Sequence, residues 1–357
     1  MGASLLPGIL VVALLAVTLR VFVFSPLSSP ERLALPDVSP HFASIPINTG
    51  LHGTVKLGVG LQGPEDVCID EDGVLYTATR DGWIKRLRKG ESAWEDWVFV
   101  HNSSILGIAA SRHGGLVVCD TEKGLLIVHE GGASLLSSHV GKSPIRFADD
   151  VIEALDGNIY FSVASTKYTL SNWFFDVLEA RPYGQLLKYD PSTKESTILL
   201  DNLAFANGVA LSKDEDFLVV CETWKFRCIK YWLKGEKAGE TEVFIENLPG
   251  GPDNINLAPD GSFWIALLQL TIQGREFFHT SKVPKHVIAT FPSLISKVTQ
   301  VFGRASVMHV GADGNVLMRH DDPQGKVCRM VTSAVEHDGH LYLGSLRNDF
   351  VGKLPLV

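Results

Sequence analysis

The chain has 357 residues, of which 45% are hydrophobic, with 33 Gly, 17 Pro and a formal net charge of −8. This composition is typical of a globular protein rich in strands and turns, and it excludes a disordered chain. The negative charge and the lack of any basic cluster argue against nucleic acid as a partner.

The first segment of the chain is apolar. Residues Leu5–Phe24 are almost wholly hydrophobic, long enough to span a bilayer, and the stretch Gly8–Leu19 also fits the core of a signal peptide. Because no basic region precedes it and no small-residue cleavage site stands out, we favour a signal anchor over a cleaved signal peptide for residues 1–25. Either interpretation places the domain in the secretory pathway: the endoplasmic reticulum membrane, the vacuole or the extracellular space. An uncleaved segment would tether it to the membrane.

Two further features agree with the secretory pathway. Asn102-Ser103-Ser104 is a glycosylation sequon, a pattern that gains meaning after a targeting segment. Five cysteines are too few for a disulfide scaffold. Cys221 and Cys228 flank a predicted hairpin in which they face each other, so the geometry allows a bridge. Two free, half-buried thiols are the alternative.

A repeated tight turn organises the rest of the chain. Six turns each precede an apolar run of strand character: Asp72-Gly73, His113-Gly114, Asp156-Gly157, Asp214-Glu215, Asp260-Gly261 and Asp338-Gly339. The separations between the first three turns, and between the fourth and fifth, suit one four-stranded blade plus a loop. We therefore predict an all-β fold, a six-bladed β-propeller over residues 59–357, because a closed ring protects the sheet edges. Residues 26–58 are predicted to form a linker and a first strand.

Two long insertions interrupt the repeat. Thr166–Tyr183 is rich in aromatic residues, and Leu270–Ala305 carries apolar residues at partly helical spacing. Inserted loops on one rim of a propeller commonly roof a binding pocket, which is the role predicted for both. Extra packing or contact with a membrane is the alternative.

Oxygen-bearing side chains recur at one position of the repeat. Four of the six units have such a residue seven positions before the turn: Glu65, Asp149, Asn207 and Asp253. In a ring, equivalent positions face a common axis, where three carboxylates would repel one another unless a hard cation lay between them. Oxygen ligands without histidine or thiolate select Ca²⁺. The sequence therefore predicts a central calcium site.

The residues that follow these positions extend the prediction. Asn254 follows Asp253 and is expected to complete the first site, whereas Asp66 and Asp150 alternate away and could hold a second, deeper cation. Acidic and amide residues also cap turns. Because four of six offsets match, capping alone is the weaker interpretation.

Four segments carry a family resemblance: GPEDVCIDEDGVLY, FANGVALSKDEDFLVVCET, PGGPDNINLAPDGSFWIAL and EHDGHLYLGSL. They resemble the strictosidine synthase-like family from about Gly63 to the C-terminus and, more distantly, the paraoxonases and gluconolactonases, which are six-bladed propellers. Paraoxonases hold a catalytic and a structural calcium. The likeness implies a catalytic set at Glu65, Asp149, Asn207, Asp253 and Asn254, and a structural set at Asp66, the Ile108 carbonyl and Asp150.

The chain departs from these relatives at three positions. Asp149 stands where relatives usually have asparagine, and the extra charge should strengthen cation binding but weaken Lewis acidity. Leu106 stands where paraoxonases place a histidine proposed as the general base. Thr332 stands where true strictosidine synthases have a catalytic glutamate, and a threonine cannot act as a base near neutral pH. This argues against true strictosidine synthesis.

The favoured function is a Ca²⁺-dependent hydrolase acting on a small, apolar lactone or aryl ester. In this interpretation Glu65 and Asp253 are indispensable ligands and Asp149 takes a proton from water. One alternative is a non-catalytic, membrane-tethered propeller pinned by calcium. Another is a condensing lyase of alkaloid biosynthesis. No nucleotide cofactor is assigned.

Overall fold

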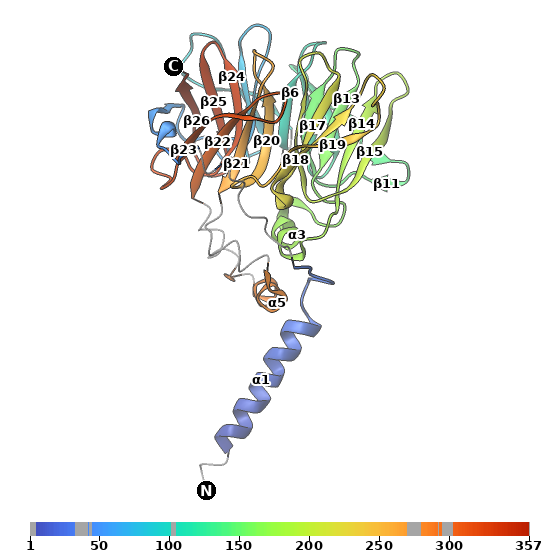
Figure 1. The fold of residues 1–357 in the computed structure, drawn as a ribbon, viewed down its shortest axis with the longest axis vertical. Helices are drawn as coiled ribbons and strands as arrows, with labels where there is room; N and C mark the ends of the chain where they lie inside the picture. Colours follow the sequence, from blue (N-terminus) through green and yellow to red (C-terminus); the bar gives the residue numbers. More distant parts are fainter. Residues whose placement is uncertain are drawn as a thin grey trace.

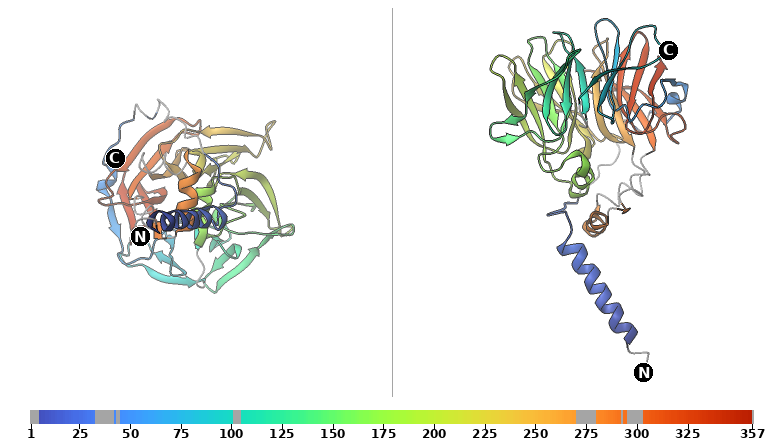
Figure 2. Two further views of the ribbon diagram at one scale, coloured as in Figure 1. Left: turned by 90° about the horizontal axis from the view of Figure 1, so that it is seen from below. Right: turned by 180° about the vertical axis from the view of Figure 1, so that it is seen from behind.

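The chain folds as a ring of six antiparallel sheets. The computed structural model describes residues 5–32, 42, 45–100, 105–269, 280–291, 293–294 and 303–356. Six four-stranded sheets stand side by side around a central axis (Figure 1), and the view along that axis in Figure 2 shows the closed ring. The predicted all-β, six-bladed propeller is therefore confirmed.

The first strand of each blade lies at the axis, where it contacts the first strands of its neighbours. From the axis outward, blade 1 holds β2 (Val67–Ile69), β3 (Leu75–Ala78), β4 (Trp83–Leu87) and β5 (Glu95–Phe99), and blade 2 holds β6 (Ile105–Ala110), β7 (Leu116–Asp120), β8 (Gly124–His129) and β9 (Gly132–Ser137). Blade 3 holds β12 (Ala148–Glu153), β13 (Ile159–Val163), β14 (Gly184–Asp190) and β15 (Glu195–Leu203), and blade 4 holds β16 (Ala206–Leu211), β17 (Phe217–Glu222), β18 (Arg227–Trp232) and β19 (Thr241–Ile245). Blade 5 holds β20 (Gly251–Leu257), β21 (Phe263–Gln269), β22 (Arg304–Val310) and β23 (Val316–Asp322), and blade 6 holds β24 (Val331–His337), β25 (His340–Ser345), β26 (Val351–Pro355) and β1 (Val55–Leu57). A separate two-stranded ribbon joins β10 (His139–Val140) to β11 (Ser143–Pro144).

The ring is closed by the early part of the chain. Strand β1 precedes blade 1 in sequence but pairs antiparallel with β26, with Val55 opposite Lys353. It thus forms the outer edge of the last blade. Because this pairing joins residues from the two ends of the propeller, it leaves no open gap between the first blade and the last.

The apolar runs of the sequence are the second strands of the blades. Strands β7, β13 and β17 are buried along their whole length, without alternation of buried and exposed residues. Both faces of these strands are covered because neighbouring blades pack face to face. In one such contact, Ile84 of blade 1 lies in the same apolar cluster as Leu116 and Val118 of blade 2.

Three of the predicted turns, at Gly73, Gly157 and Gly261, have one common geometry. The N–H of Gly73 donates to Asp70 O at 3.0 Å, and Gly157 and Gly261 make the equivalent bonds to Ala154 O and Ala258 O, both at 3.0 Å. These three glycines have φ between +77° and +94°, where a side chain would be strained. The repeated glycine therefore reflects a turn between the first and second strands that demands a left-handed residue.

The inner strands approach one another closely enough to require glycine. A Cβ atom on Gly107 would lie 2.5 Å from Asp150 Cα, and one on Gly208 would lie 2.5 Å from Asp253 O. Around the axis, these glycines alternate with the larger residues Asp150 and Asn254 of the neighbouring blades. The ring can close only because small and large residues alternate at this level.

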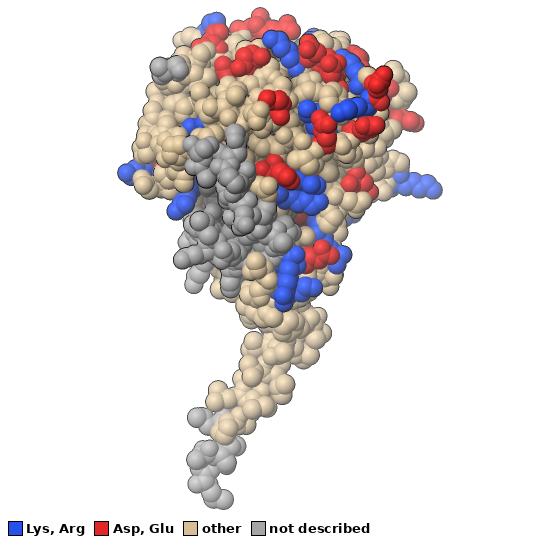
Figure 3. Space-filling view, viewed as in Figure 1, with Lys and Arg blue, Asp and Glu red and all other residues tan. Residues whose placement is uncertain are grey.

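The helices gather on one face of the ring. Helix α3 (Trp173–Glu179), preceded by the 3₁₀ turn η2 (Leu170–Asn172), and α5 (Lys282–Thr290) lie below the blades in Figure 1, and α1 (Leu5–Val23) projects from the same side. Two further 3₁₀ turns are η1 (Gly50–Gly53) and η3 (Thr223–Lys225). The visible surface of the projecting helix carries no charged side chain in Figure 3, whereas charges are frequent on the blades.

The chain after α1 is held against the propeller. The N–H groups of Ser28 and Ser29 donate to Glu179 Oε1 at 3.0 and 2.8 Å, and Lys285 Nζ donates to Glu31 O. These contacts join the N-terminal segment to both α3 and α5. Of the helices described, none is of a length and apolar character sufficient to cross a bilayer. The predicted sequon at Asn102 lies outside the described residues.

The two hairpin cysteines are opposed as predicted. Cys221 and Cys228 are register partners in blade 4, both fully buried, and their Sγ atoms are 2.6 Å apart. The structure contains them as thiols. A bridge between them stays a prediction.

The crowding at the axis predicts the effect of adding one methyl group. Gly208→Ala should lower the free energy of unfolding by about 2 kcal/mol, because the new Cβ meets backbone atoms of blade 5 that cannot move independently. Gly131→Ala is the matched control, since no heavy atom lies within 4 Å of its Cβ position. Urea unfolding of both variants measures the difference. Equal stability of the two would contradict the close approach.

Candidate metal centre

A break in strand register shapes the start of the inner strands. The pairing of first and second strands shifts between Ala148 and Val151, between Ala206 and Val209, and between Pro252 and Ile255. Such a bulge lets two successive residues depart from strict alternation. The register shift falls on Asp149 and Asp150, whose side chains line different cavities, so Asp150 does point away from the cavity that Asp149 lines.

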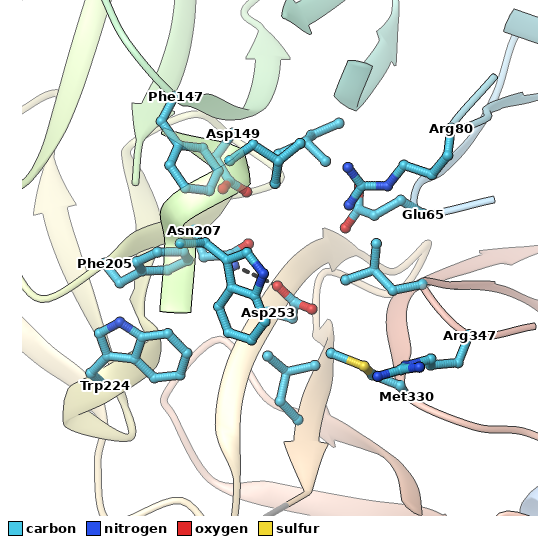
Figure 4. Close-up of a pocket in the computed structure, with 15 residues that line it drawn as sticks. Glu65, Arg80, Phe147, Asp149, Phe205, Asn207, Trp224, Asp253, Met330 and Arg347 are labelled. Carbon is cyan, nitrogen blue, oxygen red and sulfur yellow. Dashed lines mark hydrogen bonds between the residues drawn. The ribbon is translucent and has the colours of Figure 1, made fainter. Parts of the chain in front are cut away.

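The bulges bring the predicted ligands to one cavity. Its lining includes Glu65 ahead of β2, Asp149 of β12, Asn207 of β16 and Asp253 of β20, all of them buried (Figure 4). The Nδ2 group of Asn207 donates to Asp253 Oδ1. Asn254 Nδ2 donates to Glu65 Oε1 at 3.3 Å, so the fifth predicted residue also joins the cluster.

Three oxygens of this cluster have no partner. Glu65 Oε2, Asn207 Oδ1 and Asp253 Oδ2 are buried and accept no hydrogen bond from any residue that the structure describes. Leaving such atoms unsatisfied is costly, and a hard cation would satisfy carboxylate and amide oxygens together. The donor set therefore fits calcium. Within the described part of the chain, no three Asp, Glu, His or Cys side chains are gathered at metal-binding distance.

The deeper pair of carboxylates differs sharply from this cluster. Asp66 accepts the N–H groups of Val67 at 2.8 Å and Ile108 at 2.9 Å, one on each oxygen. Asp150 likewise accepts from Val151 at 2.8 Å and Val209 at 2.7 Å. Both side chains thus bind the backbone of the next blade. Ile108, expected to offer its carbonyl to a second cation, here donates its N–H to Asp66.

Burial and mutual repulsion raise the pKa values of the clustered carboxyl groups. Burial is the main cause for Glu65 and Asp149, whose pKa values lie well above their ordinary range, and nearby carboxylates add to it. Burial raises the pKa of Asp253 from 3.8 to about 8. For Arg80, on the cavity wall, burial lowers the pKa, while the charges of the carboxylates oppose that shift.

The walls of the cavity, about 240 Å³ in volume, are of two kinds. Phe147, Phe205 and Trp224 form an aromatic side: the ring centroids of the two phenylalanines are 5.4 Å apart, and those of Phe205 and Trp224 are 4.8 Å apart. Arg80 and Arg347 stand on the opposite side in Figure 4. The sequence interpretation missed all five of these residues.

Two signals in the sequence could have found them. Phe147 and Phe205 each stand two residues before a predicted ligand, in the related segments FADD and FANG. Arg80, Trp224 and Arg347 each follow the second strand of their blade by two residues. The residues just before the inner strands and those just after the second strands therefore lie at the same end of the ring as the candidate ligands.

Three residues at the cavity rim adopt a strained backbone. Phe147, Phe205 and Met330 have φ of 52°, 62° and 46°, although none is glycine. Each directly precedes an inner strand and lines the cavity. Residues of this size are rare in the left-handed region, and such strain is concentrated at functional sites.

The first insertion roofs the cavity. Leu170 and Trp173, from η2 and the start of α3, line it, as predicted for Thr166–Tyr183. Much of the second insertion lies outside the described residues. Its helix α5 contributes Ile288 and Ala289 to the apolar cluster that also contains Trp224.

The other two positions that depart from the relatives, besides Asp149, are also central. Leu106 lines the cavity, so an apolar side chain occupies that part of the wall. The hydroxyl of Thr332 is fully buried and donates to Glu65 O at 2.6 Å. Thr332 therefore supports the backbone of Glu65, and its side chain has no group that could act as a base.

Comparisons with known proteins agree on family and fold. The family model described as Strictosidine synthase matches residues 149–236, and the one described as Strictosidine synthase-like, N-terminal, matches residues 46–87. Protein STRICTOSIDINE SYNTHASE-LIKE 4 of Arabidopsis thaliana is 37% identical over 86% of this chain and 83% of its own length. Adipocyte plasma membrane-associated protein of Mus musculus is 32% identical over 92% of this chain and 84% of its own.

Solved structures share the propeller at low identity. The gluconolactonase XC5397 of Xanthomonas campestris has a TM-score of 0.62 and 15% identity, covering 93% of this chain and 98% of its own. The calcium-binding protein regucalcin of Agrobacterium tumefaciens has a TM-score of 0.61 and 15% identity, covering 87% of this chain and 96% of its own. Identity this low shows the fold alone.

The raised pKa values predict how calcium stabilises the protein at different pH. Without a cation, the folded state binds protons more tightly than the unfolded state, so stability falls as pH rises from about 4 towards about 8. Calcium needs the ionised carboxylates, so its effect should grow over the same window. We expect calcium to raise Tm by about 4 °C or more near pH 8 and by much less near pH 5.

Differential scanning calorimetry with calcium or chelator measures this. Asp253→Asn should remove most of the calcium effect near pH 8, whereas Asp72→Asn, in an exposed turn, should keep it. An equal calcium shift at both pH values would contradict the assignment of the carboxylates to the cation.

Proposed function

The chain belongs to the strictosidine synthase-like family, and on that premise we propose that it is a calcium-dependent hydrolase of lactones or aryl esters. The observation that carries the proposal is the set of unpaired oxygens on Glu65, Asn207 and Asp253 in an apolar-walled cavity. Solved propellers of the same fold include a protein named as a gluconolactonase and one named as calcium-binding. Family and fold alone would not decide the chemistry.

Five residues would hold the ion: Glu65, Asp149, Asn207, Asp253 and Asn254. Bound calcium would polarise the substrate carbonyl and stabilise the oxyanion that develops on it. The chain itself orients this set. Asn207 fixes Asp253 through its amide, Asn254 fixes Glu65, and Thr332 holds the backbone of Glu65.

Asp149 is the residue we propose to take the proton from water. It lines the cavity, and burial raises its pKa well above the ordinary aspartate range. A carboxylate with a raised pKa holds a proton more tightly and is a stronger base than an ordinary aspartate. With Leu106 in the wall instead of a histidine, a carboxylate of the cluster is the base that the cavity offers.

The aromatic side would hold the apolar part of the substrate. Phe147, Phe205 and Trp224 present flat, buried surfaces, and Trp173 and Leu170 cover the cavity from α3 and η2. Enclosure of this kind limits the access of bulk water and strengthens charge interactions inside. A small apolar ester or lactone suits such a wall.

The expected location follows from the N-terminal segment. We propose that the propeller works in the secretory pathway with α1 as a tether, because α1 exposes large apolar side chains from Ile9 to Val23. One relative is named as plasma membrane-associated.

We propose a single calcium ion per chain. The carboxylates of Asp66 and Asp150 already accept four backbone N–H groups, whereas the upper cluster has unpaired oxygens. Isothermal titration of the chelator-treated protein should give one site. Asp253→Asn should abolish it, while Asp66→Asn should keep the ion but lower Tm, because one backbone N–H loses its charged acceptor. A second tight site lost in Asp66→Asn would contradict the proposal.

Hydrolysis is tested with phenyl acetate, naphthyl acetate and a set of γ- and δ-lactones. The calcium-loaded full chain should be active, and chelator or Asp253→Ala should lower kcat/KM by about 10²-fold or more, since the carbonyl oxygen loses its counter-charge. Asp149→Asn should lower kcat while the ion stays bound. Asp72→Asn is the surface control. Calcium-dependent stability with no turnover of any substrate would instead favour the calcium-pinned binding propeller.

A further inference from the structure

The segment that follows α1 packs behind the wall of the cavity. In this junction segment, residues 25–31, Leu27 is 4% exposed and belongs to the same apolar cluster as Phe147, Phe205 and Trp224. Those three rings form the aromatic side of the cavity, and Leu27 lies behind them, since the described residues that line the cavity do not include it. A residue close to the N-terminal helix thus supports the surface on which an apolar ligand would lie.

A single carboxylate at the end of α3 holds the junction segment. The side chain of Glu179 is fully buried, and its Oε1 accepts the N–H of Ser28 at 3.0 Å, the hydroxyl of Ser28 at 2.8 Å and the N–H of Ser29 at 2.8 Å. The backbone carbonyl of Glu179 accepts the N–H of Glu31 at 2.9 Å. Three residues of the junction segment are therefore bound by one residue of the helix.

The other oxygen of Glu179 binds the first insertion. Its Oε2 accepts the hydroxyl of Tyr168 at 2.6 Å, the hydroxyl of Tyr183 at 3.1 Å and the ammonium group of Lys167. Burial alone would raise the pKa of Glu179, but its hydrogen bonds outweigh burial and lower the pKa to about 2. The carboxylate is thus ionised at neutral pH, and the bonds that it accepts are charge-assisted.

The helix held in this way is the roof of the cavity. Trp173 at the start of α3 and Leu170 just before it line the cavity, whereas Glu179 ends the same short helix. Fixing one end of a two-turn helix fixes the direction of the other. The junction segment also meets α5, because His286 Nδ1 lies 2.8 Å from Ser25 Oγ. Wall and roof therefore depend on one stretch of chain.

The contact begins where α1 ends. Residues 7–20 of α1 are exposed, and the helix projects away from the blades (Figure 1). By contrast, Val21, Leu27 and Pro30 are buried. The ring of Phe22 also lies 5.4 Å from that of His286. A plain spacer would be solvated along its length, so the burial of these residues indicates a role in the domain itself.

We propose that Leu27 and Glu179 are positioning residues of the cavity: Leu27 supports the aromatic wall, and Glu179 fixes the roof to the same segment. Affinity for the apolar part of a ligand then depends on residues 25–31. This inference rests on the proposed function, because it concerns how the same cavity holds the apolar part of an ester or lactone. The functional unit accordingly begins at the end of α1, ahead of the first blade.

Binding of two amides that correspond to the ester substrates tests the proposal without turnover. Isothermal titration of the calcium-loaded full chain measures the affinity for pentananilide and N-naphthylacetamide. Glu179→Gln and Leu27→Ala should each weaken binding by about tenfold, because a small misplacement of roof or wall spoils the fit. Calcium affinity should stay the same. Unchanged amide affinity in a variant overturns the role of its residue, and a native chain that binds neither amide overturns the whole inference.

Two matched variants separate positioning from stability. Leu116→Ala removes a buried leucine from the cluster between blades 1 and 2. Asp70→Asn weakens a carboxylate that accepts the N–H of Val74 at 2.9 Å and the hydroxyl of Tyr76 at 3.1 Å. Both should lower Tm and keep the amide affinity, and Leu27→Met should keep it too, since the volume is refilled. Amide affinity that falls with Tm in the controls as well would overturn the proposal.

Turnover of naphthyl acetate separates this inference from the hydrolase itself. In an active chain, Glu179→Gln and Leu27→Ala should raise KM and leave kcat within about twofold, because the carboxylate cluster is untouched. Weaker amide binding in these variants, without turnover by the native chain, would uphold the positioning residues and refute the hydrolase. Turnover with equal KM in the native chain and both variants would refute the positioning residues alone.

Discussion

Closure of six strands around one axis is the constraint on which the rest of this structure depends. Where the inner strands begin, neighbouring backbones come so close that Gly107 and Gly208 have no room for a Cβ. The backbone N–H groups of Ile108 and Val209, which follow these glycines at the breaks in strand register, still need acceptors in a dry interior. Asp66 and Asp150 supply them from the adjacent blades. The buried acids of this level are therefore part of how the ring is held together.

A second level of polar side chains lies above these acids. Each bulge places two successive residues near the axis, so a second ring of polar side chains is stacked on the first. The lower ring is satisfied by backbone amides, but the upper one keeps unpaired oxygens on Glu65, Asn207 and Asp253. Burial without partners is a cost to folding that structures commonly accept at functional sites. The contrast between the two rings separates the structural acids from the candidate ligands.

The fold, and the convergence of the four candidate ligands on one cavity, could be predicted because both are periodic. A turn that needs a left-handed glycine, at a fixed distance after an acidic or amide residue, repeats in the sequence as it repeats in space. Residues outside that period were missed. Arg80 and Arg347 look like ordinary surface charges until the second strands are known, and the break in strand register at Asp149-Asp150 depends on a bulge that no local propensity specifies. The roles of Asp66 and Ile108 could not be predicted, because they depend on a hydrogen bond between two blades.

The carboxylate cluster and the cavity walls stand on different parts of the fold, which can change independently. The ligand cluster stands on inner strands, where Gly208 and Asn254 interlock and a substitution disturbs two blades at once. Arg80, Trp224 and Arg347 stand on loops just after second strands, where a side chain can be exchanged without altering the ring. In a propeller of this design, residues of the cavity wall can be exchanged while the floor of carboxylate and amide oxygens at the axis stays the same.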